Sequence, residues 1–108
     1  MARRRDRLDA LAGEIETAGG TALVVAADIG DQAQAENAVA ATIERFGRLD
    51  TVINNAGPML LGRVVGADGD DWNRMIAVNL TGTFHCIQSA VPDMLAAKWG
   101  RIVTISSS

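Results

Sequence analysis

Hydrophobic positions along the chain alternate between two periods, which predicts helices and strands in turn. From about Arg5 to Ala18 the apolar residues recur at three- and four-residue spacing, as on one face of a helix, until a glycine pair stops the pattern. A second such face runs from about Gln32 to Phe46 and ends at Gly47. Between and after these segments lie three short apolar runs, at 22–26, 51–53 and 102–105. Short continuous apolar runs are typical of strands buried on both faces.

A longer helical pattern extends from about Asp70 to Ala97. Asp68 is a plausible N-cap for it, because its carboxylate can accept from backbone N–H groups of the first turn. Pro92 lies inside the pattern and predicts either a bend or a break there.

The predicted order is helix, strand, helix, strand, long helix, strand. Buried strands that alternate with helices indicate parallel pairing through right-handed crossovers. The chain has 108 residues, too few for the eight units of a barrel, so a doubly wound parallel sheet is favoured over a barrel. The expected class is therefore α/β, with helices on both faces of the sheet.

Composition narrows the class of function. The net charge of −3 argues against a general nucleic-acid binder. No apolar run approaches the roughly 20 residues that span a bilayer, and the basic start lacks the apolar core of a secretory signal. One cysteine, Cys86, permits no intrachain disulfide and fits a cytoplasmic location. His85 and Cys86 are adjacent but do not make a metal site, and both are interpreted as packing positions.

Polar residues that follow the apolar runs are the candidates for chemistry, because ligands of open parallel sheets bind outside the carboxyl ends of the strands. Asp28 follows the first run, Asn54-Asn55-Ala56-Gly57 the second, and Ser106-Ser107-Ser108 the third. The small residues Ala56 and Gly57 allow close approach to the backbone. His85 is the only histidine and no Gly-x-Ser-x-Gly elbow occurs, which argues against a Ser-His-Asp hydrolase.

These segments resemble, in order and spacing, those of the short-chain dehydrogenase/reductase family. The Asn-Asn-Ala-Gly run at 54–57 is similar to that family's motif, and Asp28-Ile29 is similar to its adenine-holding pair. The segment 75–80 resembles the one with the catalytic Asn, and 100–107 resembles the strand that ends in the catalytic Ser. The resemblance covers essentially the whole chain and implies a Rossmann fold.

The resemblance also implies a role for individual residues. Asp28 would accept from the adenine amino group, with the Ile29 backbone alongside. The residues that would line the cofactor cleft are Asn55, Ala56 and Gly57. Asn79 would hold a water in the proton relay, and Ser107 would hydrogen-bond the substrate carbonyl or hydroxyl, with Ser106 and Ser108 as neighbours that could be confused with it.

The arginine cluster near the start bears on cofactor preference. In the family, the residue that ends the second strand is often Asp when the cofactor is NAD; here Ala2 takes that position and Arg3 follows. An Arg can pair with a 2′-phosphate through charge-assisted hydrogen bonds. We therefore expect NADP, with NAD as the alternative, unless the cluster is only a solvated helix start.

Two family elements lie outside the sequence: a glycine-rich phosphate loop, expected upstream, and Tyr-x-x-x-Lys, expected downstream. Residues 1–108 are thus expected to form a partial NAD(P)-binding Rossmann domain, incomplete at both ends, whose three strands would be the third, fourth and fifth of the sheet. The chain alone is expected to be inactive, and either poorly soluble or only partly folded.

The first function hypothesis is an oxidoreductase fragment. By the same resemblance, the complete enzyme would transfer a hydride between NADP(H) and a carbonyl or alcohol, and would form a homodimer or homotetramer in which the long helix packs against a second subunit. No nucleic-acid or membrane partner is expected. The second hypothesis is a truncated, inactive nucleotide-binding or interaction module. Two smaller alternatives also stay open: Asp28 could simply cap the following helix, and Asn54 and Asn55 could be structural turn residues.

Overall fold

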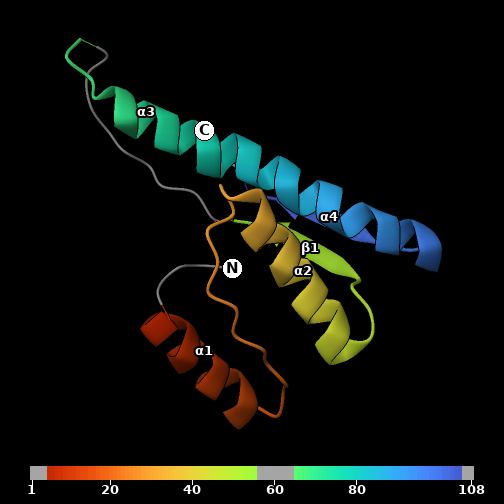
Figure 1. Cartoon of the computed structure of the whole chain (residues 1–108). Coiled ribbons are helices and arrows are strands. Elements are labelled where there is room, and N and C mark those ends of the chain that lie inside the picture. The colour runs from red at the N-terminus through yellow and green to blue at the C-terminus, as the bar shows by residue number, and fades with distance from the viewer. Residues whose placement is uncertain (1–4, 56–64, 106–108) are drawn as a thin grey trace.

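The computed structural model describes residues 5–55 and 65–105. In chain order its elements are α1 (Arg5–Thr17), α2 (Gln32–Phe46), β1 (Thr51–Asn54), α3 (Gly69–Met75), the π-helix η1 (Ile76–Thr81), α4 (Gly82–Ala97) and β2 (Arg101–Thr104) (Figure 1). The two helices predicted before residue 50 are confirmed, and the second has the predicted bounds.

The sheet of the described residues consists of β1 and β2, which are parallel as predicted. Thr51 is opposite Arg101 and Asn54 is opposite Thr104. Two further bonds frame this register: the Arg101 N–H donates to the Asp50 carbonyl (2.9 Å), and the Ile105 N–H donates to the Asn54 carbonyl (2.8 Å). The third predicted strand is thus confirmed, one residue earlier than expected.

The apolar run at 22–26 was predicted to be a strand, and this prediction is wrong. The run is extended but makes only a single β-bridge, at Ala26. A strand needs a neighbour that takes up its backbone N–H and C=O groups. Within the described residues the sheet contains only β1 and β2, and the run forms no ladder with either of them.

Local signals set the ends of α2. The Asp31 side chain accepts from the Gln34 N–H at 3.2 Å, which caps the first turn. Gly47 ends the helix in the left-handed region at φ 81°, where glycine carries no Cβ penalty. Because each signal lies directly beside the helix end that it sets, the sequence pattern alone was sufficient to place this helix.

The predicted long helix is continuous from Gly69 to Ala97 but changes character on the way. Asp68 caps it as expected, accepting from the Asp70 N–H at 2.8 Å. Residues 76–81 form a π-helix, which the apolar periodicity did not predict. Pro92 does not end the helix, which continues to Ala97 and stops at Lys98 (φ 59°).

The core lies where α4 meets α2 and β1. Its buried cluster joins Ile29, Ala35, Val78 and Cys86, with Val52 packed against it. By contrast, α1 has no buried residue. The radius of gyration is 15.4 Å, whereas about 13 Å is typical of a compact domain of roughly 100 residues. The described residues therefore form an open arrangement.

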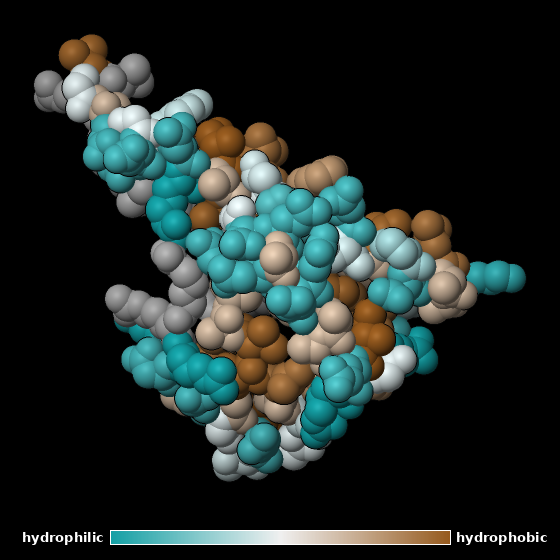
Figure 2. Space-filling view, in the orientation of Figure 1, coloured by the Kyte–Doolittle hydropathy of each residue, from teal (hydrophilic) through white to brown (hydrophobic). Residues whose placement is uncertain are grey.

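An apolar hollow separates α1 from the rest of the structure (Figure 2). It has a volume of about 270 Å³, and its lining includes Leu8, Leu11, Ile15, Leu23, Val25, Val52 and Ile53. The lining thus combines one face of α1, the run at 22–25 and strand β1.

Candidate cofactor site at the ends of the strands

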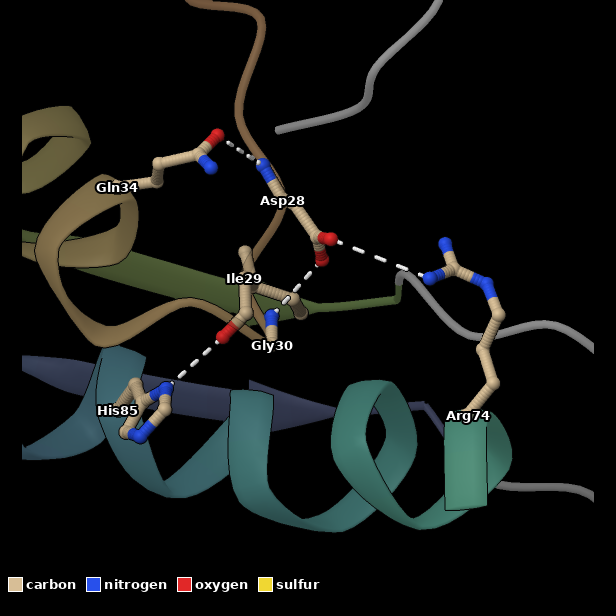
Figure 3. A network of polar contacts seen from close by, with 6 residues as sticks. All are labelled: Asp28, Ile29, Gly30, Gln34, Arg74 and His85. Carbon is tan, nitrogen blue, oxygen red and sulfur yellow. Dashed lines mark hydrogen bonds and ion pairs between the residues drawn. The ribbon is translucent and has the colours of Figure 1, made fainter. Parts of the chain in front are cut away.

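Three local hydrogen bonds hold Asp28 at the start of the turn at residues 28–31. The carboxylate Oδ1 accepts from the Gly30 N–H at 3.0 Å (Figure 3). The Asp28 carbonyl accepts from the Asp31 N–H at 3.0 Å. The Asp28 N–H donates to Gln34 Oε1 at 2.9 Å. Since Asp31 and not Asp28 caps α2, the alternative that Asp28 is merely a helix cap is wrong.

The second carboxylate oxygen of Asp28 faces the long helix. Arg74 approaches Oδ2 from the last turn of α3, with Nη1 at 3.9 Å (Figure 3). The Arg74 side chain is 38% exposed and the Asp28 side chain is 27% exposed. An ion pair at this distance and with this exposure contributes about 0–1 kcal/mol to stability. The contact thus orients the two groups more than it stabilises the fold, and the Asp28 side chain stays partly exposed.

Ile29 anchors the same turn to the long helix. Its side chain is buried in the core cluster, and its carbonyl lies 2.9 Å from His85 Nδ1. Because a carbonyl oxygen only accepts, Nδ1 is the donor and carries a proton. Gly82, one turn before His85, lies so close that a Cβ there would stand 2.7 Å from Ile29 Cγ1. The turn therefore rests directly on this helix.

Asn54, the last residue of β1, and Asn55, which follows it, differ in their surroundings. Asn54 is buried, and its Nδ2 donates to Thr104 Oγ1 on the neighbouring strand at 3.3 Å. Asn54 is therefore the last residue of β1 and not a turn residue, and its side chain links the two strands. Asn55 is exposed at the carboxyl end of β1, where a ligand of a parallel sheet would bind.

Asn79 lies in the π-helix, in the segment between the helix turns that carry Arg74 and His85. Asn79 is exposed, and its backbone carbonyl accepts from Thr83 Oγ1 at 2.9 Å. Single π-turns occur frequently at functional sites, because the wider turn changes the direction in which a side chain projects. A polar residue within an apolar stretch was the sequence signal for this position.

The structure thus brings Asp28 and Ile29 against the helix that carries Asn79, whereas Asn55 lies at the end of β1. The other predicted site residues, Arg3, Ala56, Gly57 and Ser107, lie outside the described residues. Sequence reasoning missed two contacts of this site. The sequence pattern predicts no role for Arg74 and only a packing position for His85, because their partners are 46 and 56 positions away.

Comparison with known proteins identifies the family. The family model described as short chain dehydrogenase matches residues 1–108, so the chain belongs to the short-chain dehydrogenase family. Among curated relatives, a 2,5-dichloro-2,5-cyclohexadiene-1,4-diol dehydrogenase of Sphingobium indicum is 42% identical over 87% of this chain. A trans-4-hydroxycyclohexanecarboxylate dehydrogenase of Sinomonas cyclohexanicum is 48% identical over 80% of it. The chain spans only 38% and 33% of the length of these two relatives.

Solved structures agree with the partial Rossmann fold. A metagenomic short-chain oxidoreductase in complex with NADP superposes with a TM-score of 0.93 at 33% identity, over 99% of this chain and 49% of that one. An NAD+-bound xylitol dehydrogenase gives 0.92 at 26% identity, over 97% and 41%. The described residues therefore form part of an α/β Rossmann fold. None of the helices in this described part has both the length and the apolar character to cross a membrane.

Proposed function

We propose that the whole protein is an oxidoreductase that transfers a hydride between NADP(H) and a carbonyl or alcohol substrate, and that residues 1–108 are part of its cofactor-binding domain. The observation that carries this proposal is the turn at 28–31, which presents the Asp28 carboxylate beside the helix with Asn79. Membership of a family of dehydrogenases supports the reaction class.

The residues of the turn fit the adenine end of a dinucleotide. An adenine amino group is a hydrogen-bond donor, and Asp28 offers Oδ2 as a partly exposed acceptor while Oδ1 is held by Gly30. Asp28 and Ile29 would hold the adenine. Asn55, with Ala56 and Gly57, would line the cleft toward the nicotinamide.

The chemistry would take place at the other end of the cleft. When bound, the nicotinamide would supply or accept the hydride. Asn79 would hold a water for the proton relay, and Ser107 would donate a hydrogen bond to the substrate carbonyl, or accept one from the substrate hydroxyl.

The proposal is tested by expressing the chain with its flanking coding sequence and following NADPH absorbance with a panel of aldehydes and ketones. Turnover should fall by two orders of magnitude or more in Ser107→Ala, whereas Ser106→Ala and Ser108→Ala serve as matched controls that keep most of it. A protein that binds NADPH but turns nothing over would instead support the inactive nucleotide-binding module.

Preference for NADP rests on Arg3, since the compared structures include one protein with NADP and one with NAD+. The ratio of kcat/KM for NADPH to that for NADH should fall at least tenfold in Arg3→Ala, because a charge-assisted pair with the 2′-phosphate is lost. Arg5→Ala provides a matched control for a general charge effect. Equal use of both cofactors by the unmodified protein would contradict the preference.

The long helix also offers a surface for a second copy of the protein. Four exposed apolar residues recur every fourth position on it: Trp72 (61% exposed), Ile76 (38%), Leu80 (66%) and Phe84 (58%). Such a stripe is typical of a helix face that packs against another apolar surface. We propose that it forms the contact of a homodimer or of one interface of a homotetramer.

A further inference from the structure

The turn that presents Asp28 is fixed locally, but its position relative to the rest of the site depends on a long-range contact. The three hydrogen bonds of Asp28 join it to Gly30, Asp31 and Gln34, all within six residues. These bonds move with the turn and with the start of α2. They do not set the distance between the turn and the helix that carries Asn79.

His85 provides that connection. It lies on α4, 56 positions from Ile29, and its Nδ1 lies 2.9 Å from the Ile29 carbonyl in a partly buried contact (Figure 3). A backbone carbonyl that loses its partner in such surroundings is left unsatisfied, so the turn would shift toward another donor.

Close packing also prevents Ile29 from moving nearer to the helix. Ile29 is only 4% exposed, and its side chain lies over Gly82, where a Cβ would also stand 3.1 Å from the Ile29 carbonyl oxygen. Gly82 and His85 are three residues apart and so share one helix face. The helix therefore holds Ile29 at two points, by close packing and by a directed hydrogen bond.

We propose that His85 is a positioning residue for the dinucleotide: by holding the Ile29 carbonyl it places the Asp28 carboxylate relative to Asn79. This inference rests on the proposed function, because it assigns the adenine to Asp28. His85 itself touches neither cofactor nor substrate in this assignment. Its effect is exerted through the backbone of the residue next to Asp28.

The matched pair of variants is His85→Asn and His85→Leu. The two replacements have similar size, but the Asn amide can place an N–H donor close to the position of Nδ1, whereas Leu has none. The protein, expressed with its flanking coding sequence, is titrated with NADPH by fluorescence and with 5′-AMP by competition. Reduced nicotinamide mononucleotide, which contains no adenine, is the ligand control.

We expect His85→Leu to weaken binding of NADPH and 5′-AMP by about three- to tenfold, the factor that one hydrogen bond is worth. His85→Asn should recover most of that loss, and the mononucleotide should bind equally well to all three proteins. If His85→Leu does not fold, His85→Gln replaces it, since its amide corresponds to the Nε2 end of the ring and should bind as weakly as expected for Leu.

Two results would overturn the inference alone: wild-type affinity in His85→Leu, or equal losses in His85→Leu and His85→Asn. In either case the unmodified protein would still bind NADPH and the proposed function would stand. An unmodified protein that binds neither NADPH nor 5′-AMP would overturn the proposed function, and this inference with it.

Discussion

Gly82→Ala tests whether Ile29 is packed against the helix as closely as the structure shows. A Cβ at Gly82 would stand 2.7 Å from Ile29 Cγ1, 2.9 Å from Cδ1 and 3.1 Å from the carbonyl oxygen. The side chain is buried in the core cluster, and His85 holds the carbonyl, so neither can move away at little cost.

Two opposing effects set the magnitude. In a helix interior, Gly→Ala stabilises by about 0.5–1 kcal/mol because the unfolded chain loses less entropy. Overpacking of a filled site costs about 1–3 kcal/mol. We therefore expect Gly82→Ala to lower the free energy of unfolding by up to about 2.5 kcal/mol, taking these two ranges together.

Gly13→Ala is the matched control. Gly13 lies inside α1 with nothing within 4 Å of its would-be Cβ, so only the helix-propensity gain of about 0.5–1 kcal/mol applies. The two variants should therefore differ by about 1–3 kcal/mol, the overpacking cost alone.

The assay is urea unfolding of the protein expressed with its flanking coding sequence, followed by circular dichroism, with an unchanged dependence on urea as the sign of an unchanged unfolding reaction. An Ile29→Ala background removes the two closest contacts, with Cγ1 and Cδ1, and leaves only the 3.1 Å contact with the carbonyl oxygen, so Gly82→Ala should be clearly less destabilising there. If Gly82→Ala stabilises the unmodified protein as much as Gly13→Ala does, the proposed close packing is refuted.

Three further predictions concern other parts of the chain. Asp31→Ala should lower the free energy of unfolding by about 1 kcal/mol through loss of the α2 cap, and Asp31→Ser should restore most of it; equal stability of the two variants would contradict the cap. Cys86 is 2% exposed, and burial raises the pKa of its thiol above the ordinary 9.0, so the folded protein should resist iodoacetamide at pH 7. Because the unfolded thiol ionises first, the free energy of unfolding should fall as pH rises past 9.0, and less so in Cys86→Ala; parallel pH profiles would refute this. Phe84→Glu should convert an oligomer to smaller species in light scattering, and an unchanged mass would show that the exposed helix stripe is not the interface.

The sequence was sufficient for features whose causes lie close together in the chain. The bounds of α2 follow from Asp31 and Gly47 at its ends, and the cap at Asp68 follows from the residues just after it. The parallel pairing of β1 and β2 follows from alternating helices and strands. The sequence also identifies Asp28 and Asn79 as candidate site residues, because Asp28 follows an apolar stretch and Asn79 interrupts one. Their surroundings were beyond what the pattern could predict.

Only the tertiary structure decided what depends on a distant partner. The run at 22–26 has the residues of a strand, but a ladder needs a second backbone, and neither described strand pairs with it along its length. Asn54 became structural because Thr104 is opposite it in the neighbouring strand, and His85 gained a role because folding brings it to the Ile29 carbonyl. A hydrogen bond between residues 56 positions apart leaves no periodic trace in the sequence, since side-chain periodicity records which face is buried and not which atom lies against it.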